Sequence, residues 1–396
     1  MRTVHSADRP PELPCFANVL ASVEAIGKGV LTDHVKSVDE DARFPIEAIE
    51  ALKAESLLSA YVPKEYGGHG LTITEICRLC ETMGRYCAST AMIFAMHQIQ
   101  VACIVNHAQS SSYFRQYLHD LVRHQYLLAS ATTEIGTGGD LGASICALEI
   151  EGDEFSLEKM APVISYGQQA DAILVTCRRS PDAPKGYQVH ALVHRDACKL
   201  DEISGWDTLG FRGTCSSGFK LSAHGNVNQV LPVSYADIHV RSMHPIAHLT
   251  WGSLWLGIAL DAVRLARGSV RKAARKNTDD RDIPSLRLAE LDERLFLMRS
   301  SLHDTMREYE ALAAAGDDNA FSQFGFGIRV NNVKVLCSEM VVEIVGKALG
   351  IVGISGYRNA GELSLSRHLR DAYGAALMVN NDRIRGHNAA MQIALR

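Results

Sequence analysis

Two segments of the chain combine glycines with hydroxyl side chains and could bind a cofactor. Residues 132–140 read T-T-E-I-G-T-G-G-D, and residues 163–167 read V-I-S-Y-G. Glycines let a backbone approach a flat ligand closely, and serine and threonine hydroxyls donate hydrogen bonds to it. Glycine is also frequent at 62–70 (V-P-K-E-Y-G-G-H-G), 210–214 (G-F-R-G-T) and 353–357 (G-I-S-G-Y). Glycines also form ordinary turns, so each segment alone is a weak signal.

The composition is that of a folded protein and not of a nucleic-acid-binding chain. Of 396 residues, 47% are hydrophobic and 21% are charged, which allows a large buried core. The 40 basic and 45 acidic residues give a net charge of −5. Because no basic excess can neutralise a phosphate backbone, we expect no nucleic-acid partner. At roughly 150 residues per domain, the length predicts two to three domains.

Neither a membrane span nor a secretion signal is expected. The longest apolar stretch, 88–105, is interrupted by polar residues that a lipid-facing helix would not carry. The first residues lack the apolar core of a signal peptide. Ten scattered cysteines favour reduced thiols and a cytoplasmic location. Cys77 and Cys80 form a C-x-x-C pair without nearby histidines, so we predict two buried thiols and no metal site.

The spacing of apolar residues divides the chain into three zones. Residues 1–128 are predicted to form an N-terminal helical domain, in which Pro45 starts one helix and residues 62–70 form a turn. In residues 129–240 the period shortens towards two, which predicts a central β-barrel-like domain. Its predicted elements are a hairpin around 151–154 and strands at 172–176, 187–193 and 230–240.

The helical period returns in residues 241–396 and predicts a C-terminal four-helix bundle. One helix is predicted to start at Pro284 and to end at Gly316. After a glycine-rich loop at 350–361, a last helix runs from about Leu363. Helices, then strands, then helices indicate an α+β fold and exclude a Rossmann fold, which needs alternating strands and helices.

In this order, the motifs resemble those of the acyl-CoA dehydrogenase superfamily of flavoproteins, over almost the whole chain. Residues 62–70 are similar to its P-x-x-Y-G-G-x-G, 133–140 to T-E-P-G-A-G-S-D and 210–214 to G-x-R-G-S/T. Residues 353–357, followed by L-R-D-A at 369–372, are similar to G-G-x-G-Y/F and then M-R-D-A. Four motifs in the expected order, across zones of the expected type, form a specific pattern.

The resemblance implies an FAD site between the central domain, the bundle and a neighbouring subunit. Thr132 and Thr133 match positions that contact the isoalloxazine ring in the family. Residues 163–167 match its W-I-T-N-G, so Ile164 and Ser165 are implied contacts. Ser165 supplies the hydroxyl of the family's threonine, while Val163 replaces its tryptophan.

Four further residues are implied cofactor contacts. Gly138 lies in the glycine-rich loop, and Asn381 matches a position of the C-terminal part of the site. Gly353 matches the loop that meets the adenosine half of FAD, commonly across a subunit interface. Arg275 lies where the family has R-x-x-F-G, whose arginine reaches an FAD phosphate. Here the Phe-Gly pair is absent, and a solvated helix end is the alternative.

The catalytic base of the family is missing. In typical members a glutamate after R-D-A removes the α-proton of an acyl thioester while a hydride leaves the β-carbon for the flavin. Counting from Ala372 places this position at Val379. Other members carry the glutamate on the first bundle helix, where residues 244–252 hold no carboxylate. A general base contributes about 10²–10⁴-fold, so another group must serve or the chemistry differs.

Three other side chains could replace this base. His248 lies one residue from the alternative glutamate position, and His97 lies on a helix that faces the flavin and the acyl chain in the family. A histidine can accept a proton near neutral pH. Asp382 follows position 379 by three residues. Each has a structural alternative: packing within the bundle for His248, a hydrogen-bonded core position for His97, and a surface pair with Arg383 for Asp382.

The resemblance leaves three functions open. The first is FAD-dependent dehydrogenation of an acyl thioester of coenzyme A or of an acyl-carrier protein, with an electron-acceptor flavoprotein or oxygen as oxidant. The second is a flavin-dependent monooxygenase or N-hydroxylase, although the C-terminal histidine of several such relatives is replaced by Met378. The third is a non-enzymatic relative. Because family members pair through the bundle, we expect a homotetramer or homodimer.

Overall fold

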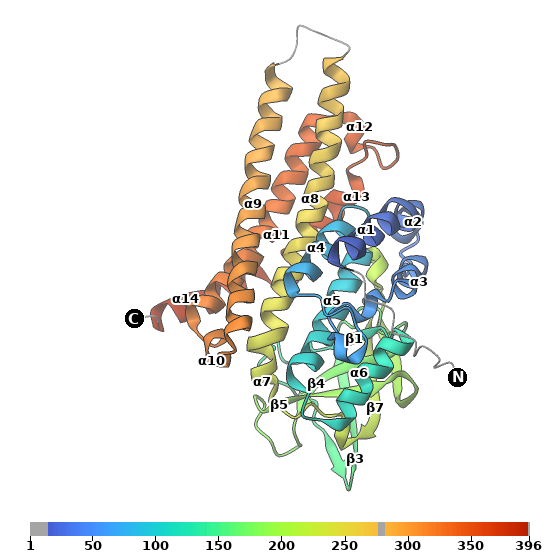
Figure 1. The fold of residues 1–396 in the computed structure, drawn as a ribbon, viewed down its shortest axis with the longest axis vertical. Helices are drawn as coiled ribbons and strands as arrows, with labels where there is room; N and C mark the ends of the chain where they lie inside the picture. Colours follow the sequence, from blue (N-terminus) through green and yellow to red (C-terminus); the bar gives the residue numbers. More distant parts are fainter. Residues whose placement is uncertain (1–14, 139, 276–281, 395–396) are drawn as a thin grey trace, which may run out of the picture.

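Helices form the first part of the chain and lie along one side of the long C-terminal helices (Figure 1). The computed structural model describes residues 15–138, 140–275 and 282–394. The helices of this part are α1 (Phe16–Ile26), α2 (Thr32–Glu40), α3 (Ile46–Ala54), α4 (Ile73–Gly84), α5 (Ala88–His107) and α6 (Ser112–His124). Shorter turns are the π-helical Gly27–Leu31 and the 3₁₀ turns Leu57–Ser59 and Lys64–Tyr66. The predicted turn at 62–70 is confirmed.

The strands gather at one end of the molecule in two sheets (Figure 1). They are β1 (Leu128–Ala131), β2 (Glu149–Glu151), β3 (Glu154–Ala161), β4 (Ala172–Arg178), β5 (Gln188–His194), β6 (Cys198–Ser204) and β7 (Gly218–Asn226). One sheet has the order β1-β4-β5, with β1 parallel to β4, and the other has the antiparallel order β2-β3-β7-β6. The predicted hairpin is confirmed, since Glu151 pairs with Glu154.

The C-terminal part is a bundle built on three long helices. Its helices are α7 (Tyr235–Ile238), α8 (His244–Ala274), α9 (Asp282–Ala315), α10 (Asp318–Phe321), α11 (Phe324–Val352), α12 (Ile354–Tyr357), α13 (Ser366–Gly374) and α14 (Asn381–Ala394). Helices α8, α9 and α11 run side by side, and α13 packs on α8 and α11 (Figure 1). The predicted order of helices, strands and helices, and with it the α+β fold, is confirmed.

Two details of the predicted C-terminal half are wrong. Residues 230–240 are not a strand: beyond one bridge between Val230 and Ala191, they form α7 and a π-helical turn (His239–Met243). The reason is local, because the side chain of Ser234 accepts the N–H of Asp237 and caps a helix. The last helix is also divided, into α13 and α14, and the predicted loop at 350–361 contains the end of α11 and all of α12.

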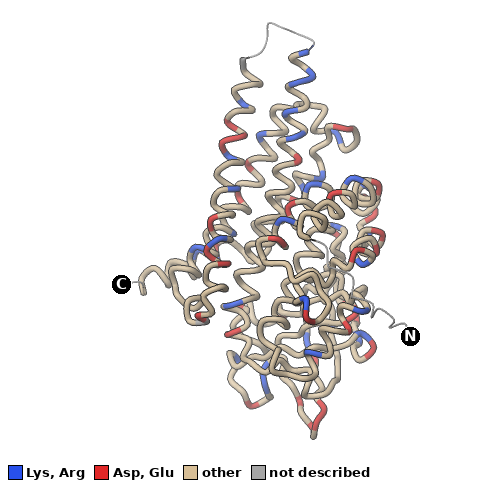
Figure 2. Tube along the Cα trace, viewed as in Figure 1, with Lys and Arg blue, Asp and Glu red and all other residues tan. Residues whose placement is uncertain are grey.

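Two of the helices are long and apolar enough to cross a membrane by length and composition alone. They are Ala88–His107 and the continuous helical stretch Tyr235–Ala274, and 94% and 89% of their most apolar windows are buried inside the protein. Burial of this extent is typical of core helices. Acidic and basic residues are interspersed along the outer helices (Figure 2).

Helices α4 and α8 cross at backbone contact. A Cβ atom at Gly257 would lie 2.3 Å from the carbonyl oxygen of Glu81 and 2.9 Å from the Cα of Gly84. A Cβ at Gly84 would lie 2.4 Å from the carbonyl oxygen of Leu254. Only glycine fits at both positions, so the two residues set how closely the N-terminal helices approach the bundle.

We expect Gly257→Ala to lower the free energy of unfolding by about 1–3 kcal/mol, because the added methyl forces the two backbones apart. Gly268→Ala on the same helix is the matched control, since a Cβ there meets nothing within 4 Å, and it should stabilise by up to about 1 kcal/mol. Chemical denaturation measures both. Equal effects of the two substitutions would contradict the close crossing.

Candidate functional site

The loop that follows β1 leaves space for a ligand. Thr132 and Thr133 come directly after the strand and are half-buried, and Thr132 Oγ1 lies 2.8 Å from Ser130 Oγ. Gly136 and Gly138 have φ angles of +96° and +63°, which glycine adopts without steric penalty. A Cβ at Gly138 would meet no atom within 4 Å. A ligand can therefore approach the backbone at Gly138.

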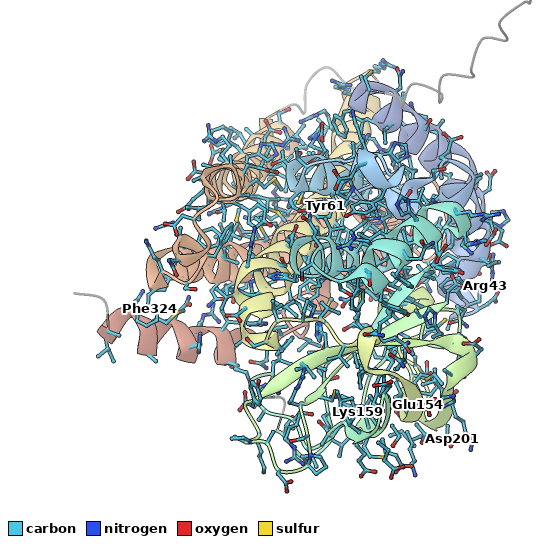
Figure 3. All side chains as sticks on the ribbon, turned by 60° about the horizontal axis from the view of Figure 1, so that its bottom comes forward. Arg43, Tyr61, Glu154, Lys159, Asp201 and Phe324 are labelled. Atoms are coloured by element: carbon cyan, nitrogen blue, oxygen red, sulfur yellow. The ribbon has the colours of Figure 1, made fainter. Side chains whose placement is uncertain are left out.

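A buried ion pair anchors this loop. The Glu134 carboxylate accepts hydrogen bonds from Ser144 Oγ and from the N–H of Cys146, each at 2.7 Å, and lies 3.3 Å from Lys159 Nζ. The Lys159 ammonium, which lies among the strands (Figure 3), also donates to the carbonyl of Thr176 at 2.7 Å. Burial raises the pKa of Glu134, but the Ser144 hydrogen bond and the Lys159 charge outweigh it and the net pKa is lowered. The sequence analysis missed Lys159, although it occupies an inward position of the alternating strand β3.

Ser165 belongs to a row of buried hydroxyls. Ser216 Oγ donates to Ser165 Oγ at 2.7 Å and lies 2.7 Å from Thr214 Oγ1, which donates to the carbonyl of Phe211 at 2.9 Å. The N–H of Ile164 donates to the carbonyl of Ser217 at 2.9 Å and fixes the turn. Ser165 therefore stands at the end of this row, with its hydroxyl placed by Ser216.

Both ring nitrogens of His97 are bonded to backbone. Nδ1 accepts the N–H of Leu128 at 3.0 Å, and Nε2 lies 2.6 Å from the carbonyl oxygen of Leu58, to which it donates in this tautomer. Burial lowers the pKa of His97 to about 4. The carbonyl of Leu128 in turn accepts from Tyr166 Oη at 2.9 Å. In this arrangement His97 fixes β1 on α5, and neither nitrogen is free to take a proton.

His248 lies in a row of rings that runs from the sheet into the bundle. Successive ring centroids are 4.5–6.1 Å apart in the series His190, Tyr235, His239, His244, His248 and Trp251. The Nδ1 atom of His248 is buried without a hydrogen-bond partner. Burial, with smaller contributions from neighbours such as Lys334, lowers the pKa of His248 well below its ordinary value. The ring is therefore neutral near pH 7 and enclosed, with 3% of the residue exposed.

The segment between α13 and α14 contains the position of the missing glutamate. Val379 has a φ of +51°, a left-handed conformation that β-branched residues rarely adopt. Its carbonyl accepts from Lys334 Nζ at 2.7 Å, and the same ammonium donates to Asn381 Oδ1 at 2.8 Å. The Asn381 side chain is thus bonded inside the bundle. The sequence analysis missed Lys334, which reads as an ordinary helical lysine.

The start of α14 contacts the glycine-rich loop. Arg383 Nη2 donates to the carbonyl of Gly138 at 2.5 Å, so the bundle and the loop meet on this side of the site. The Asp382 side chain is 92% exposed and lies 3.6 Å from Arg385. Asp382 is therefore a surface acid in an ion pair, as predicted, but its partner is Arg385 and not the predicted Arg383.

Two predicted cofactor contacts lie far from this loop in the same subunit. Gly353 directly follows α11 with a φ of +71°, and a Cβ there would meet no atom within 4 Å. Arg275 follows α8 and is exposed, and the rest of its motif lies outside the described residues. Figure 1 shows the ends of α8 and α11 at the upper part of the bundle, away from β1. Among the described residues, no group of three or more His, Cys, Asp or Glu could hold a metal ion.

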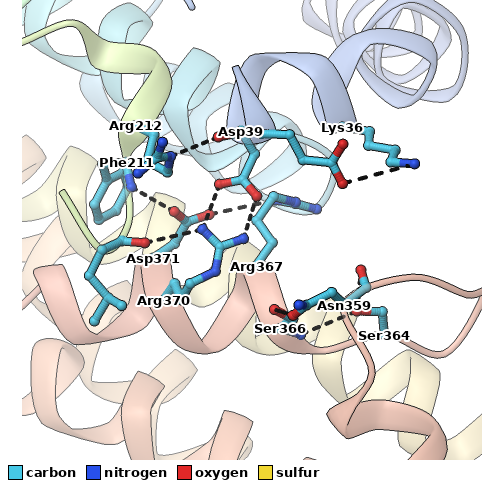
Figure 4. A network of polar contacts seen from close by, with 12 residues as sticks. Lys36, Asp39, Phe211, Arg212, Asn359, Ser364, Ser366, Arg367, Arg370 and Asp371 are labelled. Carbon is cyan, nitrogen blue, oxygen red and sulfur yellow. Dashed lines mark hydrogen bonds and ion pairs between the residues drawn. The ribbon is translucent and has the colours of Figure 1, made fainter. Parts of the chain in front are cut away.

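The G-F-R-G-T and R-D-A motifs bind each other where three parts of the chain meet (Figure 4). The N–H of Phe211 donates to Asp371 Oδ1 at 2.7 Å. The Arg370 guanidinium pairs with both carboxylate oxygens of Asp39 on α2. A Cβ at Gly210 would lie 2.2 Å from the carbonyl oxygen of Arg370. These two motifs therefore join the three parts of the fold.

Comparison with protein families decides which fold family this architecture represents. The model of the acyl-CoA dehydrogenase N-terminal domain matches residues 17–125, and that of the C-terminal domain matches residues 249–381. The chain belongs to the acyl-CoA dehydrogenase family. The family comprises flavoproteins in which FAD is the typical cofactor, as the resemblance of the motifs predicted.

Curated relatives of this family member are distant. The short-chain specific acyl-CoA dehydrogenase of Clostridium acetobutylicum is 24% identical over 60% of this chain and 61% of that protein. The match therefore spans less than two thirds of that relative. Cyclohex-1-ene-1-carbonyl-CoA dehydrogenase of Syntrophus aciditrophicus is 25% identical over 85% of this chain and 79% of its own.

Solved structures share the fold across different chemistries. FMN-bound TdsC of Paenibacillus sp. A11-2 has a TM-score of 0.82 at 18% identity and covers 96% of this chain and 98% of its own. Butyryl-CoA dehydrogenase of Megasphaera elsdenii has a TM-score of 0.81 at 17% identity and covers 98% of this chain and 100% of its own. The nitrososynthase of Micromonospora carbonacea var. africana has a TM-score of 0.81 at 19% identity and covers 98% of this chain and 99% of its own. At such identities the likeness shows the fold alone.

We expect His97→Phe to lower the free energy of unfolding at pH 7.5 by about 2–4 kcal/mol, because the Leu128 N–H and the Leu58 carbonyl lose their partner. The wild-type protein should also lose stability as the pH falls from about 6.5 towards 4. In that window the unfolded chain binds a proton at His97 that the folded chain, with a pKa of about 4, does not. Denaturant titrations at several pH values measure both effects. Unchanged stability with lost flavin reduction would instead assign His97 to the chemistry.

Proposed function

We propose that this family member is an FAD-dependent oxidoreductase that dehydrogenates an acyl thioester of coenzyme A or of an acyl-carrier protein. The proposal rests on one observation, the open backbone at Gly138 in a loop that begins with the hydroxyl residues Thr132 and Thr133. Ser165 adds a buried hydroxyl at the end of a row of hydrogen bonds. The carbonyl and nitrogen edge of a flavin needs such donors, and the absence of side chains at the glycines lets the ring approach.

In this proposal, the residues of one subunit hold the flavin end of the cofactor. Thr132, Thr133, Gly138, Ile164 and Ser165 bind and orient it, and the Asn381 side chain supports it through the bundle. When bound there, FAD would supply the hydride acceptor for the substrate, with an electron-acceptor flavoprotein or oxygen as the final oxidant. The chain itself must bind the thioester, exclude water and hold the proton that leaves the α-carbon.

His248 is the proposed acceptor of this proton. Val379 cannot accept one, and Asp382 faces solvent. The Nδ1 atom of His248 is unbonded, and Lys334, which holds the Val379 carbonyl, lies close enough to lower the pKa of His248. In this proposal the neutral imidazole of His248 supplies the base that the segment around position 379 lacks.

The proposed enzyme is an oligomer, in which Gly353 and Arg275 reach the cofactor of a neighbouring subunit. Four apolar side chains on α9 and α12 support such pairing, because they are 68–72% exposed: Leu286, Phe296, Ile354 and Tyr357. Exposed apolar faces of this kind are typical of interfaces. Light scattering at micromolar concentration should report a homotetramer or homodimer, and a monomeric mass would contradict this part of the proposal.

Anaerobic reduction tests the proposed reaction. The purified protein should be yellow or should bind added FAD, and one member of a panel of acyl-CoA and acyl-carrier-protein thioesters should bleach the flavin. Persistent absorbance with every thioester would contradict dehydrogenation. A colourless protein that cannot be reconstituted would favour the third function, a non-enzymatic relative.

A flavin-dependent monooxygenase or N-hydroxylase is the second candidate. The observation that favours it concerns three positions where a base was sought: position 379 is valine, both His97 nitrogens are bonded and His248 is enclosed. Oxygen activation on a reduced flavin does not require a carboxylate at position 379. Oxygen consumption that depends on supplied reduced flavin and yields a hydroxylated product would support this function over dehydrogenation.

We expect His248→Gln to slow flavin reduction by the active thioester about 10²-fold or more while FAD stays bound, because the amide cannot take the proton. Stopped-flow absorbance measures the reduction, and FAD fluorescence measures binding. Val379→Glu should restore part of the rate in the His248→Gln background, provided its carboxylate reaches the α-carbon. Full reductive activity of His248→Gln would remove the assignment.

A further inference from the structure

A lysine without an ion-pair partner lies in the centre of the bundle. Lys334 on α11 has no exposed surface, and its Nζ is 5.9 Å from the centroid of the Trp255 ring on α8. Within the described parts of the chain its ammonium forms no ion pair, and its two acceptors are neutral: the Val379 carbonyl at 2.7 Å and Asn381 Oδ1 at 2.8 Å.

This arrangement is costly for folding. Removing an ammonium group from water without an opposite charge is unfavourable, and burial lowers the pKa of Lys334 to about 8 despite the opposing charge of Glu339. The folded chain therefore binds this proton more weakly than the unfolded chain, so at neutral pH the charge subtracts from stability. An apolar side chain would avoid this cost but could not donate to the two acceptors.

Its two acceptors lie on either side of Asn380. The Val379 carbonyl belongs to the link between α13 and α14, one residue before its end, and Asn381 begins α14. Asn381 is further held by α11, because its Nδ2 donates to Ser338 Oγ at 3.0 Å and to Glu339 Oε1 at 3.3 Å. The C-terminal side of residue 379, which has a left-handed conformation, is therefore held by α11, and the first turn of α14 is attached to α11.

The first turn of α14 extends this attachment to the cofactor loop. Arg383, two residues after Asn381, donates to the carbonyl of Gly138 at 2.5 Å. A continuous series of bonds thus leads from Lys334 through Asn381 and the helix backbone to Arg383 and Gly138. Movement of Lys334 would be transmitted to the loop, since each member of the series holds the next.

We propose that Lys334 is a positioning residue, whose bonds to Val379 and Asn381 hold the segment 375–381 and the start of α14 against the Gly138 loop, and thereby organise the flavin site. The proposal rests on the proposed function only in that this loop binds FAD. The bonds from Lys334 to the segment are present in the chain without a cofactor, so they can be tested in the flavin-free protein.

The test compares Lys334→Met with Lys347→Met. Both replace a lysine of α11, but Lys347 pairs with Glu290 at the surface. Hydrogen exchange of the flavin-free protein should be at least 10-fold faster in residues 375–381 for Lys334→Met and unchanged for Lys347→Met. The dissociation constant for FAD, from fluorescence, should rise at least 10-fold only for Lys334→Met. Its midpoint of thermal unfolding should fall no further than that of the control, because the buried charge is gone.

A rescue and a double substitution complete the test. Lys334→Gln, which keeps an N–H donor, should recover part of the affinity for FAD. Lys334→Met with Asn381→Ala should weaken FAD binding less than the product of the two single effects, because both act through one contact. The proposal would be overturned if the two single effects on the dissociation constant for FAD simply multiplied in the double variant. Unchanged hydrogen exchange in residues 375–381 would also overturn it, as would a general loss of stability with faster exchange throughout α11. If the wild-type protein binds no FAD, the proposed function fails, while the exchange experiment still decides the role of Lys334.

Discussion

The site depends on a junction of buried and half-buried charges where the three parts of the chain meet. Asp39 comes from the N-terminal helices, Arg212 from the strand region, and Arg370 with Asp371 from the bundle (Figure 4). Arg212 Nε donates to the Asp39 carbonyl at 2.8 Å, while the Asp39 carboxylate binds Arg370. Each part supplies a charge or a backbone group that another part must satisfy, because a buried polar group without a partner is costly. This requirement gives the three parts one relative arrangement.

The junction extends into the hydroxyl row beside the proposed cofactor. Phe211, whose N–H is held by Asp371, offers its carbonyl to Thr214, and the row continues through Ser216 to Ser165. Ser165 is therefore placed by a contact with the C-terminal bundle that lies several residues away. The Glu134–Lys159 ion pair likewise fixes the position of the glycine-rich loop, by joining it to the sheets. Both positions are set by buried polar networks, which are rigid when all their members are satisfied.

Position 379 is where this chain departs from the motif of typical family members. In this chain a strained valine stands where typical family members, as the motif resemblance implies, carry the base, and a buried ammonium holds its carbonyl. Backbone strain of this kind persists only where neighbouring contacts impose it. The segment has thus kept a defined conformation without the carboxylate. That combination is consistent with another group taking the proton, or with a reaction that needs no proton acceptor there.

Much of the fold was predictable from the sequence because it follows from local interactions. Thr72 and Glu75 form a reciprocal cap at the start of α4, the turn at Gly152 closes the hairpin of β2 and β3, and apolar spacing marks the long helices. The glycine and hydroxyl motifs identified the family and the loop after β1. Each of these signals lies within a few residues of the structure that it specifies.

Other features were decided only by contacts between distant segments. The sequence could not show that His97 would bond to Leu58 and Leu128, nor that Lys159 and Lys334 would be buried, since lysine on a strand or helix is usually exposed. The pairing of the G-F-R-G-T and R-D-A motifs joins residues about 160 positions apart. Residue types and spacing thus determined most of the elements and the family, while the segments at 230–240 and after Leu363 were predicted wrongly. Tertiary packing decided which polar side chains are hydrogen-bonded within the fold and which are left available for chemistry. Their hydrogen-bond partners come from distant segments, which meet only in the folded chain.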